Sequence, residues 1–134
     1  MIEVYIDGAS AGDPGHSGAG VHIRNDQQSE SYSIPLGIMN NHQAEFFALL
    51  HAVEICEQKG YDMVSFRTDS QAVARAIEKE FVKNPTYREI FLSIQQVLSR
   101  NPLFFVKWVP SKENLVADDL SRKAIRLSKA EEDA

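Results

Sequence analysis

The stretch Met1-Ile-Glu-Val-Tyr-Ile-Asp7, followed at once by Gly8-Ala-Ser-Ala-Gly-Asp-Pro-Gly15, decides the fold of this chain. Its first part alternates β-branched and aromatic residues, which is typical of a strand, and it ends in a carboxylate. Ligands of α/β proteins lie where strands end, because the turns that follow leave backbone groups free and splay side chains into a crevice. Asp7 is therefore the first candidate for chemistry, although an isolated Asp-Gly pair is more often an ordinary turn.

The rest of the chain predicts two further strands, and then helices that alternate with strands. After residues 2–7, we expect strands 18–24 and 31–36, a helix 44–56, a strand 63–68, helices 70–80 and 86–100, a strand 103–109 and a helix 114–127. Turn residues separate the first three strands, which favours an antiparallel meander, whereas helices connect the later strands, which must then be parallel. This order predicts an α/β fold with a mixed sheet, in which the strand 2–7 lies centrally beside the strand 63–68.

Composition and charge bound the class of protein. The 134 residues are 43% hydrophobic and 25% charged, which suits one domain with a single core. We expect this domain to span residues 1–128, with an acidic, frayed tail at 129–134. There is no stretch typical of a signal peptide or a membrane span, and Cys56 has no second cysteine to pair with, so we expect a cytoplasmic protein. The net charge of −5 argues against broad attraction to nucleic acid, so such binding must be local or bridged by metal.

Three more carboxylates are expected to lie near Asp7. Asp69 ends the strand that we place beside the first, so the two aspartates would lie about 5 Å apart, which is costly unless a cation lies between them. At 100° per residue, Glu45 points to the buried side of its helix, where an acid is more often part of a site than a solvated residue. In the last helix, Asp118 flanks the apolar face, whereas Asp119 faces solvent among basic residues.

Four motifs in this order resemble the type 1 ribonuclease H family, and the resemblance covers nearly the whole chain. They are Asp7-Gly-Ala-Ser with its glycine-rich turn, Asn41-His-Gln-Ala-Glu45, Thr68-Asp69-Ser-Gln71 and Glu113-Asn-Leu-Val-Ala-Asp118-Asp-Leu-Ser121. The resemblance implies a three-layer, ribonuclease H-like fold with a five-stranded mixed sheet in the order 3-2-1-4-5, flanked by helices. It also implies an endonuclease that hydrolyses the RNA strand of RNA/DNA hybrids and leaves 5′-phosphate and 3′-hydroxyl ends.

The resemblance further implies a cofactor and a role for each acid. Two Mg²⁺ ions roughly 4 Å apart, or Mn²⁺ in their place, would activate a water and stabilise the leaving 3′ oxygen, and such hard cations require oxygen ligands. By resemblance, Asp7 bridges both ions, Asp118 completes the nucleophile side, and Glu45 and Asp69 complete the leaving-group side. Because the scissile phosphate would supply further oxygens, metal affinity without substrate should be weak.

Residues for substrate choice also follow from the resemblance. The 2′-hydroxyl distinguishes RNA from DNA, and the family positions that touch RNA near the cut correspond to Ser10, Gly12, Asn41 and Gln71. From the residues alone, Asn41 is a helix cap and Gln71 a surface residue in a first turn, and the cap is compatible with an RNA contact. Lys112 lies near the place where family members carry a histidine or an arginine, but a charged lysine cannot accept a proton.

The sequence departs from the family pattern in several places. Asp13 and His42 stand where members usually carry Asn, and Val109-Pro-Ser-Lys-Glu113 lacks the histidine that many bacterial members have there. Only Phe81-Val-Lys-Asn84 separates two helices where many members have a basic protrusion. This compact form, without that protrusion or an N-terminal hybrid-binding domain, predicts low affinity for the substrate.

The four histidines do not form a ligand cluster by their spacing. His22 alternates within a strand and His51 points to the polar side of its helix, which favours structural or solvated roles for both. His16 lies in the loop beside Asp7, where contact with the substrate is the less favoured of two interpretations. Trp108 is expected in the core or at a packed edge rather than as a platform for base stacking.

Two other functions stay open. One is a hybrid-binding or regulatory module that keeps the fold but has weak or no catalysis, which the departures and the acidic charge favour. The other is an unrelated member of the fold, such as a resolvase or exonuclease, which the matches at Asn41 and Gln71 disfavour. We expect an RNA/DNA hybrid as partner, no membrane, no obligate protein partner and a monomer.

Overall fold

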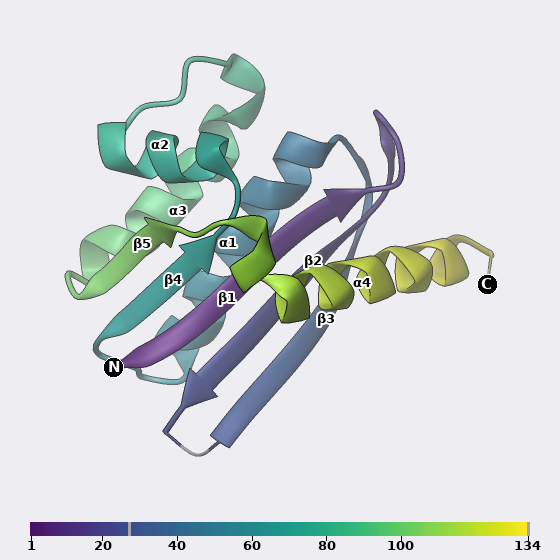
Figure 1. The fold of residues 1–134 in the computed structure, drawn as a ribbon. Helices are drawn as coiled ribbons and strands as arrows, with labels where there is room; N and C mark the ends of the chain where they lie inside the picture. Colours follow the sequence, from purple (N-terminus) through teal and green to yellow (C-terminus); the bar gives the residue numbers. More distant parts are fainter. Residues whose placement is uncertain (27, 134) are drawn as a thin grey trace.

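The structure, a computed structural model, describes residues 1–26 and 28–133 and consists of one five-stranded sheet with helices on both faces (Figure 1). The strands are β1 (Ile2–Ser10), β2 (Gly15–Asn25), β3 (Gln28–Met39), β4 (Val64–Thr68) and β5 (Phe104–Trp108). The helices are α1 (Asn41–Gln58), α2 (Gln71–Lys79), α3 (Arg88–Arg100) and α4 (Leu115–Asp133), with short 3-10 helices η1 (Pro85–Tyr87) and η2 (Ser111–Glu113). None of the described helices combines the length and hydropathy that crossing a bilayer requires.

The strand order is β3-β2-β1-β4-β5, which confirms the expected topology. β1 pairs antiparallel with β2 and parallel with β4, and β5 extends the parallel part of the sheet. The parallel pairing of β1 and β4 ends where Ile6 lies opposite Thr68. The next residues, Asp7 and Asp69, therefore lie together at the point where the two strands separate.

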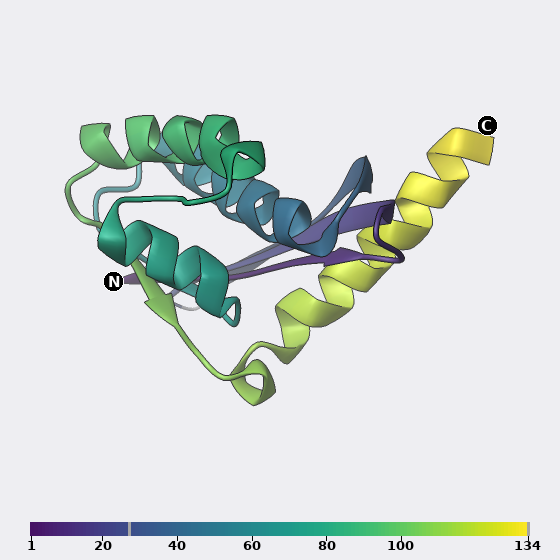
Figure 2. The same ribbon diagram turned by 90° about the horizontal axis from the view of Figure 1, so that it is seen from above.

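The hydrophobic core lies between the sheet and two helices. Alternate residues of the central strands, such as Val4, Ile6 and Phe66, are buried and pack in one cluster with apolar residues of α1 and α3. Cys56 is buried in this core, as expected, and burial raises the pKa of its thiol to about 12. Seen from above, α1 and α3 lie on one side of the sheet and α4 on the other, which gives three layers (Figure 2).

α4 approaches its face of the sheet closely because β2 carries glycine where the helix crosses it. A Cβ atom on Gly20 would overlap the backbone carbonyl of Ala117, and one on Gly18 would overlap Ala124. Gly20 is the partner of Asp7 across the β1–β2 ladder. The absent side chain therefore lets α4 lie directly over the part of the sheet that carries Asp7.

Two segments differ from the sequence prediction in their extent. β2 and β3 are longer than expected, because they pair with each other from Gly15 to Asn25. α4 continues to Asp133 and so runs through most of the segment expected to be a tail, whose described residues are exposed. His16 belongs to β2 rather than to the preceding loop, and it contacts α4 through Ser128 (Nδ1 to Oγ, 3.0 Å) and an ion pair with Glu132.

Candidate active site

Asp7 lies at the centre of the four predicted acids. β1 continues to Ser10, so Asp7 lies within the strand rather than at its end as predicted. Ser121 of α4 donates a hydrogen bond from Oγ to Asp7 Oδ2 (2.9 Å). Burial, with the charges of Asp69 and Asp118, raises the pKa of Asp7 from 3.8 to about 8. A carboxyl pKa raised in this way indicates that several negative charges lie close together where water has limited access.

Asp69 is held by a rigid turn between β4 and α2. The side chain of Ser70 caps α2 by accepting from Val73 N (3.2 Å), and Thr68 Oγ1 accepts from Ser70 N (3.0 Å). The backbone carbonyl of Asp69 accepts from Trp108 Nε1 (3.2 Å), so β5 also holds the turn. Trp108 thereby packs at the edge of the sheet, as expected, although 44% of the residue is exposed.

Glu45 reaches the site because α1 begins directly above β1. A Cβ on Gly8 would overlap the backbone of Ala44, so the glycine after Asp7 is what allows this approach. The side chain of Glu45 is 19% exposed, and its Oε1 lies 3.1 Å from Nδ1 of His42. Burial raises the pKa of Glu45, with a smaller contribution from Asp69, while Ser70 and His42 oppose the change.

Asp118 and Asp119 point in the different directions that the helical arrangement predicts. Asp118 lies close enough to Asp7 to raise the pKa of Asp7 and is 39% exposed, whereas Asp119 is 79% exposed. Arg122 forms ion pairs with both aspartates, and its Nη2 atom lies 3.2 Å from Oδ1 of Asp119. The contact between Arg122 and Asp118 was missed, because we assigned the basic residues of this helix to the surface around Asp119.

The structure thus brings together acids from β1, α1, α4 and the end of β4. Asp7 interacts with Asp69 and Asp118, and Asp69 with Glu45. In the described residues, however, no group of three or more acidic, histidine or cysteine side chains is arranged so that it could hold a metal ion. Two of the acids have other partners instead, since Asp118 contacts Arg122 and Glu45 contacts His42.

The predicted substrate residues Ser10, Gly12 and Asn41 form a small network. Asn41 Oδ1 accepts a hydrogen bond from Ser10 N (2.9 Å), and Ser10 Oγ lies 2.6 Å from Gly12 O and 3.3 Å from Gly12 N. The predicted cap at Asn41 is wrong, because Asn40 caps α1 in a reciprocal pair with Gln43. Ser10, Gly12 and Asn41 line a hollow of about 610 Å³ that also contains Asp13.

The other two predicted substrate residues are exposed. Gln71 lies in the first turn of α2, as the residue pattern alone indicated. Lys112 lies in η2, where it lines a separate cavity with Tyr5 and His22. His51 is half-buried, which agrees with the structural role among the two expected for it, and burial lowers the pKa of its imidazole.

Two residues that position the acids were not identified from the sequence. Asn114 is buried, and its Nδ2 donates to the carbonyl of Ile6 (2.8 Å), so the start of α4 is joined to β1 one residue before Asp7. Ser121 is also buried and bonds to Asp7. Both residues belong to the last of the four sequence motifs. The sequence signal that could have identified them is a polar residue on the same side of the helix as Asp118.

A basic groove adjoins the acids on the side of His42. It has a volume of about 390 Å³ and is lined by Arg75, Lys79 and Lys83, none of which forms an ion pair with any described residue. Phe81 is 60% exposed beside it, and the ring of Tyr87 stacks on Phe46 with centroids 5.5 Å apart.

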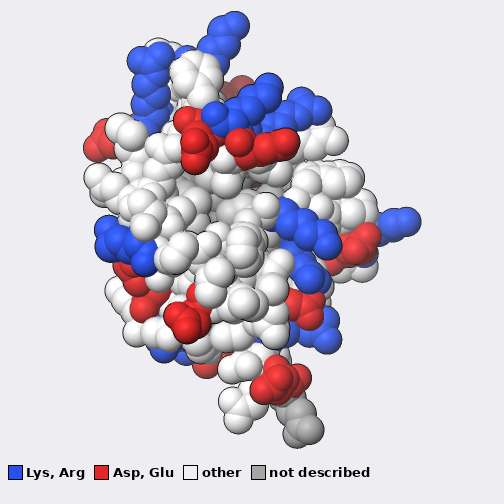
Figure 3. All heavy atoms as spheres, turned by 90° about the vertical axis from the view of Figure 1, so that its left-hand side faces the viewer, with Lys and Arg blue, Asp and Glu red and all other residues white. Residues whose placement is uncertain are grey.

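Positive charge therefore gathers locally in a chain whose net charge is −5. Basic side chains, with acidic ones beside them, project at the upper end of Figure 3. In Figure 1, α2 and the segment that follows it occupy this level.

Comparison with other proteins gives a consistent family. The family described as reverse transcriptase-like matches residues 5–124. EbsB of Enterococcus faecalis, provisionally named a hydrolase, is 36% identical over 128 residues, which are 94% of this chain and 95% of EbsB. Ribonuclease HI of Halobacterium salinarum is 30% identical over 127 residues, which are 92% of this chain and 64% of that protein.

The solved structures agree with the sequence comparison. LC11-RNase H1, isolated from compost by a metagenomic approach, is 31% identical and has a TM-score of 0.87, with 96% of this chain and 97% of that chain covered. A second structure of LC11-RNase H1, 29% identical with a TM-score of 0.87, contains an RNA/DNA hybrid and covers 96% of this chain and 99% of that one. With the strand order and the four motifs, these matches show that the chain belongs to the type 1 ribonuclease H family.

Proposed function

We propose that this protein hydrolyses the RNA strand of RNA/DNA hybrids at internal positions, leaving 5′-phosphate and 3′-hydroxyl ends. The observation that carries the proposal is the convergence of carboxyls from β1, α1, α4 and the end of β4 around the half-buried Asp7, where burial and the charges of Asp69 and Asp118 raise the pKa of Asp7. Carboxyl groups that lie so close together that their ionisation is disfavoured are typical of functional sites. The hybrid bound to LC11-RNase H1 supports the choice of substrate.

The donor set of the four acids fits divalent cations. All the side-chain donors are carboxylate oxygens, which Mg²⁺ and Mn²⁺ prefer, and a cation beside Asp7 would offset the repulsion that raises its pKa. Asp7, Glu45, Asp69 and Asp118 would hold two such ions once Glu45 and Asp118 turn from His42 and Arg122 towards Asp7, because the acids do not form a ready-made metal site among the described residues. The bound ions would supply an activated water and charge stabilisation for the leaving 3′ oxygen.

The surrounding residues orient the acids and read the substrate. Ser121 fixes the Asp7 carboxylate through its hydrogen bond, and Asn114 holds the start of α4 against β1. Because Asn41 Oδ1 is engaged by Ser10 N, the Asn41 side chain is fixed and its NH₂ group stays available as a donor. That NH₂ group would contact a 2′-hydroxyl, with Gln71 as a second donor.

The basic groove would carry the phosphates of one strand. Arg75, Lys79 and Lys83 have no ion-pair partners among the described residues, and exposed Phe81 lies beside them. Phosphate contacts of this kind supply affinity without reading sequence. The groove would take over part of the role of the missing basic protrusion.

A second candidate function is hybrid binding with weak or no catalysis. Arg122 forms an ion pair with Asp118. Lys112 lies in η2, just before α4, where many family members carry a histidine, and its charged amine cannot accept a proton. Both observations favour slow turnover over loss of binding. Binding of the hybrid in Ca²⁺, compared with its cleavage in Mg²⁺, separates the two functions.

The choice of substrate is tested with four duplexes of the same sequence, each about 20 base pairs long. We expect cuts only in the RNA strand of the RNA/DNA hybrid, and none in double-stranded RNA, double-stranded DNA or a hybrid whose RNA is fully 2′-O-methylated. The fragments should carry 5′-phosphates that a phosphatase removes. Equal cutting of the methylated hybrid would contradict reading of the 2′-hydroxyl, and tight binding without any cut would favour the second function.

A further inference from the structure

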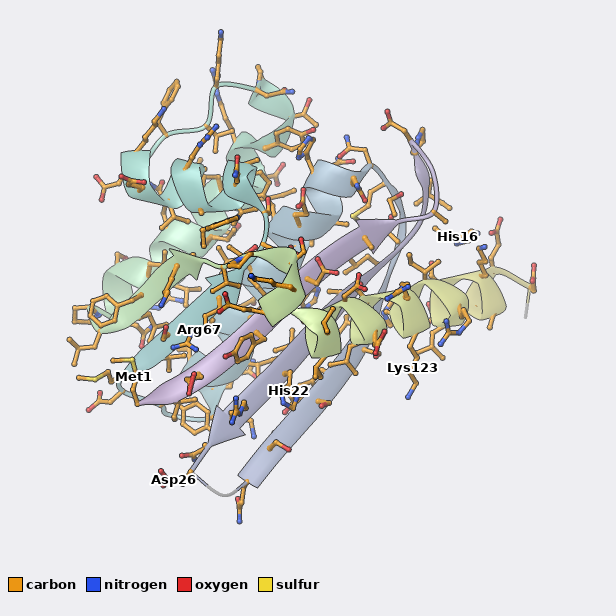
Figure 4. The ribbon with its side chains drawn as sticks, in the orientation of Figure 1. Met1, His16, His22, Asp26, Arg67 and Lys123 are labelled. Atoms are coloured by element: carbon orange, nitrogen blue, oxygen red, sulfur yellow. The ribbon has the colours of Figure 1, made fainter. Side chains whose placement is uncertain are left out.

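A second cavity lies on the face of the sheet that α4 crosses. It has a volume of about 320 Å³ and is formed by β1, the far end of β2, η2 and the first turn of α4. Figure 4 shows His22, one of its wall residues, beside the start of α4. None of the four acids belongs to its wall, so it is separate from the candidate active site.

Two cations on this wall have no partner. Arg24 and Lys112 are exposed, and neither forms an ion pair with any residue in the described part of the chain. Burial and the charge of Arg24 lower the pKa of His22, so the effect of the guanidinium reaches into the cavity. Among the described residues that line the cavity, Glu113 is the one acid, so the lining has a net positive charge. In a chain with a net charge of −5, this surplus indicates an anionic ligand.

The rest of the wall offers fixed rings and aliphatic side chains. The Tyr5 hydroxyl accepts from Arg67 Nη1 (2.9 Å), and His22 Nδ1 lies 2.9 Å from Ser31 Oγ, so both rings are held in place. Burial and the charge of Arg24 lower the pKa of His22, which favours the uncharged ring. Leu115 and Val116, in the first turn of α4, are 63% and 50% exposed. A planar ligand would cover apolar surface that is now in water.

Asn114 joins this cavity to the candidate active site. It lines the wall, is 1% exposed, and its Oδ1 has no hydrogen-bond partner. A buried acceptor without a partner is unfavourable, so this part of the wall favours a ligand that donates a hydrogen bond. The Nδ2 atom of Asn114 bonds to the carbonyl of Ile6, immediately before Asp7. A ligand that contacts Asn114 would therefore also affect the position of Asp7.

We propose that this cavity binds a nucleoside 5′-monophosphate, with the phosphate between Arg24 and Lys112 and the base against Tyr5 and His22. The volume is at the lower end of the range for small-molecule sites, which suits one nucleotide rather than an oligonucleotide. Inorganic phosphate would use only the cations, and a nucleoside only the rings. Glu113 supplies an acceptor for a ribose hydroxyl. The site does not depend on the proposed hydrolysis.

The test is a titration of the protein with adenosine 5′-monophosphate. Binding is measured by calorimetry and by NMR of the His22 and Tyr5 ring protons. EDTA is present throughout, so that no metal can hold the nucleotide at the four acids. Adenosine and inorganic phosphate are titrated separately. Arg24→Gln removes a cation from the wall, and Lys123→Gln is the matched control, since Lys123 is an exposed cation of α4 outside the cavity (Figure 4).

We expect saturable binding of adenosine 5′-monophosphate to the wild type and to Lys123→Gln, with shifts of the His22 and Tyr5 signals. Arg24→Gln should bind at least about tenfold more weakly, because it loses a charge-assisted contact to the phosphate. Adenosine and phosphate should each bind more weakly than the nucleotide. Equal affinity of Arg24→Gln and Lys123→Gln, phosphate binding as tight as that of the nucleotide, or no saturation would overturn the proposal.

Discussion

Asp7 holds its proton more firmly than an ordinary aspartate, because burial and the charges of Asp69 and Asp118 oppose its ionisation. Its pKa is about 8 in the folded protein, against an ordinary value of 3.8. Between these two values the folded state binds more protons than the unfolded state. The contribution of Asp7 to the stability of the metal-free protein therefore falls as pH rises from about 4 to about 8, and it is constant above that range.

Replacing Asp7 by Asn should remove this dependence. In EDTA, we expect the free energy of unfolding of Asp7→Asn to exceed that of the wild type at pH 8 by a few kcal/mol, on the order set by a shift of this size. At pH 4 the two should be nearly equal. Urea denaturation from pH 4 to pH 8 measures the difference, and Asp119→Asn, at an exposed site, is the control. Parallel curves for wild type and Asp7→Asn would contradict the assigned pKa.

Arg122 competes with metal for Asp118 in the proposed site. Arg122→Gln should lower the Mg²⁺ concentration needed for half-maximal cleavage, because Asp118 loses its ion-pair partner. The pair is partly exposed, so its value is at most about 1 kcal/mol and the expected change is up to about fivefold. Lys123→Gln should leave the metal requirement unchanged. A higher metal requirement in Arg122→Gln would show that Arg122 supports the site rather than competing for it.

The four acids could be predicted from the sequence, but several of their partners could not. Each acid follows a strand signal or lies on a definable side of a helix, and their expected proximity agrees with their effects on the pKa values of Asp7 and Glu45, while their role as metal ligands stays a prediction. Arg122, Ser121 and Asn114 contact the site because of the distance between α4 and the sheet. That distance depends on tertiary packing rather than on periodicity.

At the scale of elements, the contact between α4 and β2 controls the geometry of the site. Gly20→Ala should destabilise the protein by about 1–3 kcal/mol, because the new Cβ would overlap the backbone of α4 and the helix would have to move away. Asp118 and Ser121 would move with it, so cleavage should fall even where the protein is fully folded. Thermal denaturation and single-turnover cleavage measure the two effects.

The matched control for Gly20→Ala is Gly37→Asn. Gly37 has a φ of +81° with open space around it, and Asn is the non-glycine residue that best tolerates this region. Gly37→Asn should cost about 1 kcal/mol of stability because of the positive φ, but it should leave cleavage intact because nothing near Gly37 has to move. Wild-type activity in a folded Gly20→Ala protein would contradict the role given to the close approach of α4.

The order of the elements followed from the sequence more reliably than their ends did. Alternation and helical periodicity predicted all five strands and the four helices of the described chain in their observed order. The cap of α1 was misassigned because Asn40 and Asn41 are adjacent, and only Asn40 has a capping partner, in Gln43. α4 extends beyond residue 127, and its added length contacts His16, which is distant in the sequence.

At the scale of the whole molecule, an acidic protein must bind a polyanion through local charge. The sequence predicted low affinity from the missing protrusion, while the groove of Arg75, Lys79 and Lys83 concentrates positive charge beside the acids. Changing all three to Gln should weaken hybrid binding in Ca²⁺. It should also reduce the slope of log affinity against log salt by up to about 3, because fewer counterions are released.

The control for the groove carries the same change in net charge. Lys123, Arg126 and Lys129 are exposed on α4, and changing these three to Gln should affect the salt dependence much less. Fluorescence anisotropy of a labelled hybrid at several salt concentrations measures both variants. Identical slopes for the two triple variants would contradict a specific role for the groove.

Cleavage of an end-labelled RNA/DNA hybrid by the wild type and by Asp69→Asn, at matched concentrations in Mg²⁺ and then in Mn²⁺, tests the central claim most directly. Asp69→Asn removes a carboxylate charge from a turn at the end of β4 without removing core volume, so the fold should persist, as circular dichroism would show. We predict metal-dependent cuts in the RNA strand by the wild type and none by Asp69→Asn. Retained cleavage in Asp69→Asn, or no cleavage by a well-folded wild type, would contradict the account.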